Sequence, residues 1–164
     1  MQETIISLFV GMPKELATFL MAMLPITELR ASIPVAILKY GLSPLSAFFW
    51  SVLGNVFLGA LAILLIEPIT KFIIKKSEFL DKIWRRYIGR LRMKNKEKFS
   101  KWEAWALVSF VAIPLPMTGA FSGAVAASIF QIDTKKAISL IMLGCIISGA
   151  IVTSITVFSF NLIH

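Results

Sequence analysis

Two oppositely charged residues interrupt an apolar run that is otherwise long enough to cross a bilayer. Glu28 and Arg30 lie in the segment PITELRASIP, inside the run 16–38. A charge at the centre of a bilayer costs at least about 2.5–3.5 kcal/mol, so such residues usually face a cavity or a partner. A carboxylate there can exchange a proton, and a guanidinium can bind phosphate or carboxylate through its planar fork. The alternative is a structural ion pair, or a turn that rests at the membrane interface.

A second segment, 114–119, reads PLPMTG and offers exposed backbone rather than charge. Half-helices that end at such a break direct free amides at anions and free carbonyls at cations. Thr118 adds a hydroxyl group. Gly119 and Gly123 have the small-xxx-small spacing of touching membrane helices, so packing explains them as well as ligand contact does. Asn55 is a polar residue of the intervening apolar run that can reach a substrate or bridge two helices.

Together these residues define one candidate site for a substrate or a proton. Its members are Pro25, Thr27, Glu28, Arg30, Pro34, Asn55, Pro114, Pro116, Thr118, Gly119 and Gly123. An enzyme signature does not accompany them: the chain has a single histidine, His164, and lacks a glycine-rich phosphate loop followed by Lys-Ser/Thr. We therefore expect a protein that is not an enzyme, with no catalytic residue, no metal and no cofactor.

The composition indicates an integral membrane protein. Of the 164 residues, 57% are hydrophobic and 16% are charged, and the mean hydropathy is +0.82. Average soluble domains have about 45–50% apolar and 25% charged residues. The single cysteine, Cys145, excludes an internal disulfide and lies in an apolar run, where packing is its expected role.

Two apolar runs can cross a bilayer on length alone. Residues 42–66 and 137–163 are uncharged over 25 and 27 residues, and a spanning helix needs about 20. Each run begins near a helix-start signal, Ser43-Pro44 in the first and Asp133-Thr134 in the second. We expect Glu67-Pro68 to end the first span at a membrane interface.

Two further runs, 16–38 and 104–132, contain prolines that argue against a single straight helix. Each is either a kinked span or two half-helices that fold back as a re-entrant hairpin, enclosed by protein or a water-filled cavity. Short loops rich in lysine and arginine stay in the cytoplasm. Residues 71–101 hold twelve of the 17 lysines and arginines, and Lys135 and Lys136 join that side only if 104–132 is a hairpin. Charge placement therefore favours the hairpin.

A shared pattern in the two halves of the chain predicts the fold class. Residues 53–60 and 143–150 both read LGxxxxGA, 90 residues apart, although this motif alone is weak. If each half has one hairpin and one span, the halves are inserted in opposite directions, an inverted repeat common in secondary transporters. We predict an all-α integral membrane protein built as such a repeat of re-entrant helical hairpin plus transmembrane helix. A single membrane domain, 1–164, would comprise repeat one (about 15–67), a connector (about 68–102) and repeat two (about 103–163).

The connector is predicted to be a basic amphipathic helix on the membrane surface. Apolar residues recur at helical spacing over 79–91, and lysines and arginines fill the other face. Such a helix lies flat on anionic lipid, while a solvated loop is the plainer alternative. Its tether to a membrane domain argues against a nucleic-acid partner. We expect a prokaryotic-type inner or cell membrane with the basic loop 71–101 in the cytoplasm.

Two motifs carry a resemblance to a known family. ELRASIP at 28–34 and PLPMTGAFSG at 114–123 resemble the small multi-drug export proteins, which are grouped with the DedA/VTT membrane-protein superfamily. The resemblance covers about residues 15–160. It implies two inverted halves and lipid transport, including scrambling and the recycling of polyprenyl-phosphate carriers. Carried over by position, Glu28 matches the acidic residue of the first turn.

The chain departs from the better-known DedA members at the second turn. Those proteins carry arginines around it, where this chain has Ala112, Pro114, Pro116 and Thr118. A phosphate-lipid substrate must therefore be held by Arg30 alone, or the substrate is of another kind.

Three functions remain open at this level. The first is a transporter, flippase or scramblase of an anionic lipid such as a polyprenyl phosphate or phospholipid, with Glu28 as a candidate for proton coupling. The alternative is a proton-coupled small multidrug exporter in which Glu28 binds proton and drug in turn. The third is a structural or assembly membrane protein. The expected partner is an anionic membrane lipid, and a homo-oligomer is left open.

Overall fold

The described part of the protein is entirely helical. A computed structural model describes residues 11–75, 100–115, 118–130 and 132–163. Its helices are α2 (Lys14–Ala22), α3 (Glu28–Leu38), α4 (Pro44–Lys75), α6 (Ser100–Ala112), α7 (Ala120–Ile129) and α8 (Thr134–Ile163). Strands are absent from these residues, so the predicted all-α class is confirmed.

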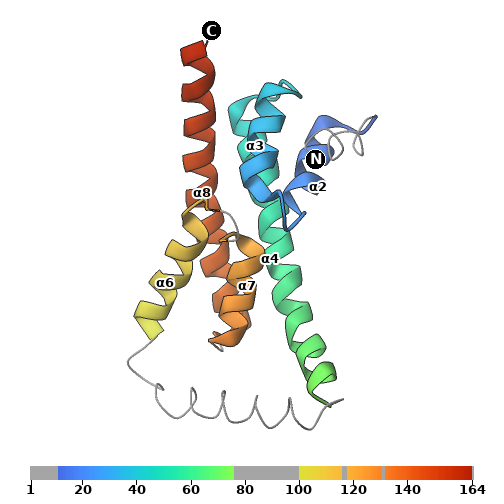
Figure 1. Ribbon diagram of the computed structural model, residues 1–164, viewed down its shortest axis with the longest axis vertical. Coiled ribbons are helices and arrows are strands. Elements are labelled where there is room, and N and C mark those ends of the chain that lie inside the picture. Colours follow the sequence, from blue (N-terminus) through green and yellow to red (C-terminus); the bar gives the residue numbers. More distant parts are fainter. Residues whose placement is uncertain (1–10, 76–99, 116–117, 131, 164) are drawn as a thin grey trace.

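Two helices are long and apolar enough to span a membrane. They contain the stretches Pro44–Ile66 in α4 and Thr134–Leu162 in α8, with hydropathies of 2.2 and 2.3. α4 and α8 contact each other and run in opposite directions (Figure 1). Less than half of each stretch is buried inside the protein, which leaves apolar side chains such as Phe49 and Ile155 on the outside. The two predicted spans are therefore present as helices suited to lipid.

Both long helices begin at the predicted capping residues. The Ser43 hydroxyl accepts a hydrogen bond from the Ser46 amide at 3.2 Å. Asp133 Oδ1 accepts hydrogen bonds from the amides of Lys135 and Lys136 at 3.1 and 3.3 Å. These bonds satisfy amides that lack a partner within the first helical turn. The expected helix starts are confirmed.

Two prolines lie inside helices. α4 continues through Glu67-Pro68 to Lys75, although its apolar span ends at Ile66, next to the predicted boundary, and Pro34 lies inside α3. An interior proline removes one backbone hydrogen bond and costs about 3 kcal/mol. The residues after Pro68 keep apolar side chains at helical spacing, and α3 is held to α4 by a 2.8 Å hydrogen bond between Ser32 and Ser51. The hydrogen bond to α4 and the helical spacing of apolar residues after Pro68 outweigh the loss of one backbone hydrogen bond.

The other prolines do separate helices. The run 16–38 forms α2 and α3 joined by the turn 23–27, and the run 104–132 forms α6 and α7 joined by residues 113–119. Figure 1 shows these two helix pairs at opposite ends of the molecule, with both turns directed toward its middle. Two half-helices, rather than one kinked helix, therefore occur in each run.

The glycines of the LGxxxxGA motif have matching packing roles. α2 packs against α4, and α6 packs against α8. A Cβ at Gly54 of α4 would collide with the backbone carbonyl of Phe19 in α2. A Cβ at Gly144 of α8 would lie 2.6 Å from Val111 Cβ in α6. α2 therefore packs against α4, and α6 against α8, at places where only glycine permits the approach.

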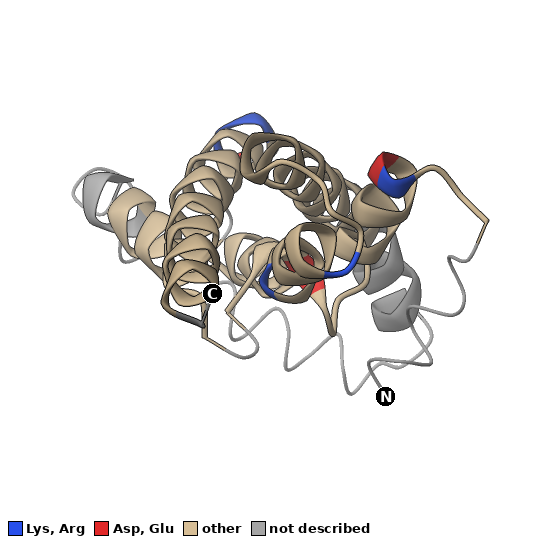
Figure 2. Cartoon of the chain, turned by 90° about the horizontal axis from the view of Figure 1, so that it is seen from above, with Lys and Arg blue, Asp and Glu red and all other residues tan. Residues whose placement is uncertain are grey.

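Charged residues are scarce along the helices (Figure 2). α7 and the stretch 44–66 of α4 carry none. Glu28 is the one buried carboxylate among the described residues, and it is 2% exposed. The predicted amphipathic helix at 79–91 lies outside the described residues, so its structure and the cytoplasmic location of 71–101 stay predictions.

Candidate functional site

The two turns meet at one carboxylate. Glu28 is the first residue of α3, and Gly119 is the N-cap of α7. Gly119 lies directly against the Glu28 side chain, because a Cβ at position 119 would overlap the carboxylate. The backbone amide of Phe121, in the first turn of α7, donates a hydrogen bond to the same carboxylate. Amides at a helix start favour an anion, so the first hairpin caps the inner helix of the second.

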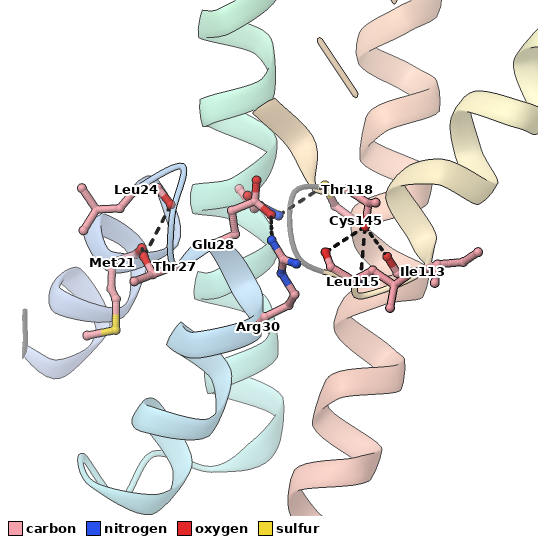
Figure 3. A network of polar contacts seen from close by, with 10 residues as sticks. Met21, Leu24, Thr27, Glu28, Arg30, Ile113, Leu115, Thr118 and Cys145 are labelled. Atoms are coloured by element: carbon pink, nitrogen blue, oxygen red, sulfur yellow. Dashed lines mark hydrogen bonds and ion pairs between the residues drawn. The ribbon is translucent and has the colours of Figure 1, made fainter. Parts of the chain in front are cut away.

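Arg30 binds the same carboxylate from its own helix. Its Nη2 donates a hydrogen bond to Glu28 Oε2 at 3.0 Å (Figure 3). The Glu28 side chain is 3% exposed and that of Arg30 is 19% exposed. A buried ion pair needs further hydrogen bonds to offset the loss of solvent, and the Phe121 amide supplies one. The pair is thus buried at its anionic end and accessible at its cationic end.

The backbone of Glu28 is held in an unusual conformation. Its φ of 48° is the one positive φ of a non-glycine residue in the described chain. Such a conformation costs about 1–3 kcal/mol and persists where the surroundings enforce it. The preceding turn does so, since the Thr27 hydroxyl lies 2.6 Å from the Met21 carbonyl and 3.4 Å from that of Leu24 (Figure 3). This turn orients the carboxylate toward α7.

Thr118 stabilises the second turn. Its hydroxyl lies 2.8 Å from the Ile113 carbonyl and 2.9 Å from the Leu115 carbonyl, and it accepts the Leu115 amide at 3.2 Å. The hydroxyl is therefore engaged by its own turn in this structure. This second turn places Gly119 and the start of α7 beside Glu28.

A narrow cavity, too tight to admit a water molecule, lies between the turns and the long helices. Six of the predicted site residues line it: Glu28, Arg30, Asn55, Pro114, Thr118 and Gly119. Asn55 and Ser148, from α4 and α8, are 1% and 3% exposed. Asn55 Nδ2 lies 3.8 Å from Cys145 Sγ, while Asn55 Oδ1 has no hydrogen-bond partner. Glu28, with its buried carboxylate, and Asn55, with its unsatisfied amide oxygen, thus line the same cavity.

A larger groove runs along the first turn and α3 and reaches the first turn of α7 at Phe121 and Ser122. Its volume is about 870 Å³, within the range of small-molecule sites. Its lining includes the predicted residues Pro25, Thr27, Arg30 and Pro34, and also Lys39. Residues 27, 30, 31, 34, 35 and 38 line it at helical spacing and form one face of α3. Arg30 and Lys39 are the charged groups among the described lining residues, and most of the remainder are apolar.

Two predicted residues are absent from the described linings of these spaces. Pro116 lies outside the described residues, so its place stays a prediction. Gly123 lies inside α7, where a Cβ would be 2.6 Å from Val111 Cγ2, so its described surroundings are those of a packing residue. Conversely, Lys39, Ser148 and the Phe121 amide were not predicted. Helical periodicity could have indicated two of them: the helical face that starts at Thr27 leads to Lys39, and Ser148 lies on the same face of its helix as Gly144. The Phe121 amide could not have been found in this way, because every residue type except proline carries a backbone amide.

We expect Gly123→Ala to destabilise the protein by about 1–3 kcal/mol, because overpacking forces neighbouring side chains to move. In the double variant Gly123→Ala/Val111→Ala, the colliding methyl group is gone, so the combined loss should be smaller than the sum of the two single losses by about 0.5–3 kcal/mol. Thermal denaturation of the purified protein in detergent measures all three variants. Additive losses would contradict the close contact of α6 with α7.

Comparison with known proteins identifies one matching sequence family. Residues 28–151 match the sequence family described as "Putative small multi-drug export protein". No curated protein and no solved structure matches the chain. The match favours the export alternative over the first interpretation, an anionic-lipid flippase, and describes a transporter rather than an enzyme. It does not extend to the DedA/VTT superfamily, which remains a resemblance. Since the match begins at Glu28, directly after the first turn, includes the second turn and covers more than half of the 164 residues, the chain belongs to the family "Putative small multi-drug export protein".

Proposed function

We propose that this chain exports small amphiphilic molecules across a membrane through the groove along α3, and that Glu28 is its proton site. The family description and two helices suited to a bilayer support export. The position of Arg30 carries the proposal, because this residue lines the groove and also binds the Glu28 carboxylate. A molecule that reaches Arg30 therefore acts directly on the one buried carboxylate of the described chain.

Proton binding at Glu28 would loosen the contact between the two hairpins. The ionised carboxylate accepts charge-assisted hydrogen bonds from Arg30 and from the Phe121 amide, and such bonds are about twice as strong as neutral ones. A proton removes the charge and weakens both bonds. The start of α7 is then free to separate from the start of α3, which would open the narrow cavity between them.

This movement fits a transporter made of two inverted halves, which we propose as the architecture. Three observations support it: the opposite positions of the two hairpins in Figure 1, the matching roles of Gly54 and Gly144, and a contact between Asn55 and Cys145. Asn55 and Cys145 occupy the same place in the two copies of LGxxxxGA. Equivalent residues of two copies meet at a two-fold axis. Transporters of this plan work by moving one half against the other around a central site.

A second candidate function, the flipping of an anionic lipid, is favoured by the charge of the groove. Arg30 and Lys39 line it together with apolar residues. A guanidinium binds a phosphate group with good geometry, and apolar walls suit an acyl or prenyl chain. A cationic drug would find no carboxylate among the described lining residues. Anionic amphiphiles, whether lipids or small molecules, therefore match the groove better than cations.

Transport by the purified protein in liposomes tests the proposal. We would impose a pH gradient of either sign and follow one anionic and one cationic amphiphilic dye, with labelled phosphatidylglycerol as a lipid probe. Movement of the anionic dye that depends on the gradient is the expected result. Lipid flipping without dye movement would favour the second candidate. Absence of both, in protein that remains folded, would favour a structural or assembly role and overturn the proposal.

A further inference from the structure

One side chain connects the groove with the cavity behind it. Arg30 lines both spaces, and its Nη2 is bonded to Glu28 Oε2. Because 19% of the Arg30 side chain is exposed but only 3% of the Glu28 side chain, a ligand in the groove reaches the cation of the pair and not the anion. The groove therefore communicates with Glu28 through Arg30.

An anionic ligand in the groove competes with Glu28 for this guanidinium. A single hydrogen bond, through Nη2, joins Arg30 to Glu28, whereas a guanidinium presents five N–H donors in a planar fork. A sulfonate, phosphate or carboxylate head group can bind such a fork through two parallel bonds. Binding of this kind withdraws positive charge from Glu28 and makes the ionised carboxylate less favourable.

Asn55 offers an acceptor that only the protonated carboxyl can use. Its Oδ1 is buried without a partner and lies on the cavity that Glu28 also lines. An ionised carboxylate has no proton to donate, while a protonated one carries an O–H group. Thr118, another polar residue of the cavity, is already engaged by its own turn. Protonation of Glu28 would thus satisfy an oxygen that the ionised form leaves unpaired.

Among the groups around Glu28, Arg30 is the positive charge that favours the ionised carboxylate. α3 contributes Arg30, α7 the Phe121 amide and α8 the Cys145 thiol, and α4 contributes Asn55 through the shared cavity. Among the residues whose side chains the structure describes, the other charges are Lys14, Glu15, Lys39, Asp133, Lys135 and Lys136, and all of them lie at or next to helix ends. A change at Arg30 therefore has the largest effect on the carboxylate.

We infer that an anionic amphiphile in the groove and a proton on Glu28 bind together, each promoting the other, with Asn55 Oδ1 accepting the hydrogen bond of the protonated carboxyl. The proton comes from the aqueous phase, and the carboxyl O–H is the one bond formed. Linkage of this kind is reciprocal, so low pH must tighten binding by the same factor by which the ligand favours the proton. The inference rests on the proposed function of the groove and specifies its ligand as an anion that binds with a proton, not in exchange for one.

Proton uptake on ligand binding tests this directly. The probe is a fluorescent alkyl sulfonate, which stays anionic at every accessible pH and so brings no proton of its own, and the protein is the full chain in a non-ionic detergent. We expect wild-type protein to take up a proton, as a fraction of one per bound sulfonate, in weakly buffered solution with a pH indicator. The affinity should fall by up to about tenfold per pH unit as Glu28 becomes ionised in the free protein. An alkyl trimethylammonium of equal chain length is the matched control and should cause no uptake.

Two variants separate the parts of the inference. Glu28→Gln should bind the sulfonate more tightly, without pH dependence and without proton uptake, because the competing anion is gone. Asn55→Leu should retain binding but take up fewer protons at the same pH, because the acceptor is missing.

Sulfonate binding to wild type with no proton uptake, or with proton release, would overturn the inference and leave the groove's function intact. Failure of the sulfonate to bind at all would overturn the proposed function of the groove and the inference with it. Both decisive measurements use wild-type protein, so they do not depend on the folding of a variant.

Discussion

Replacing Gly119 with alanine should reduce transport by about 10- to 100-fold while the protein stays folded. The added Cβ would occupy the position of the Glu28 carboxylate, which sits on a flexible side chain and can move away. Moving it removes the hydrogen bonds that the carboxylate accepts from Phe121 and Arg30. Hydrogen bonds to charged groups contribute about 1.5–3 kcal/mol, which corresponds to the stated range. Initial rates of anionic-dye movement in liposomes measure the effect.

Gly59→Ala is the matched control for this experiment. A Cβ at Gly59 of α4 would come within 3.0 Å of Ile141 and 3.2 Å of Ala120, a contact that small shifts relieve. This glycine lies outside the described linings of the cavity and the groove, so transport should change far less than in Gly119→Ala. Wild-type rates in Gly119→Ala would show that the contact between the first turn and α7 has no part in transport.

Glu28→Gln and Arg30→Ala should each abolish proton-dependent transport, but they should differ in stability. Arg30→Ala leaves a carboxylate that is 3% exposed without its counter-ion, and breaking a buried pair from one side typically costs about 3–5 kcal/mol. Glu28→Gln leaves Arg30, which is 19% exposed and can turn toward the groove. We therefore expect Arg30→Ala to lower the thermal denaturation midpoint more than Glu28→Gln does.

The double variant Glu28→Gln/Arg30→Ala distinguishes a functional pair from a structural one. Removal of both charges should recover stability relative to Arg30→Ala, with a coupling energy of about 0.5–3 kcal/mol, and transport should remain absent. If the single variants lose stability yet retain proton-dependent transport, the ion pair only stabilises the fold, and Glu28 is not the proton site. Arg30→Lys adds a further comparison, because lysine keeps the charge but loses the planar fork.

Local chemistry along the chain was sufficient for much of the fold. The apolar composition and two uncharged runs predicted α4 and α8, and Ser43 and Asp133 marked their first turns. Such signals work because a cap or a span depends on neighbouring residues alone. That Pro34 and Pro68 lie inside helices was not evident from the sequence, because the loss of one hydrogen bond is local, whereas the contacts that outweigh it are not.

The candidate site shows where residue types stop being informative. Glu28 and Arg30 stood out because charges are costly in an apolar run, and Asn55 because it is polar in such a run. No pattern of residues indicated that Glu28 would meet the start of α7, about 90 residues later, or that Arg30 would line a groove. The Phe121 amide is a backbone group that any residue would carry, and Asn55 acquires its unsatisfied oxygen only from the way α4 and α8 pack. These relations depend on the relative positions of distant helices, which close contacts at Gly54, Gly119 and Gly144 set in three dimensions.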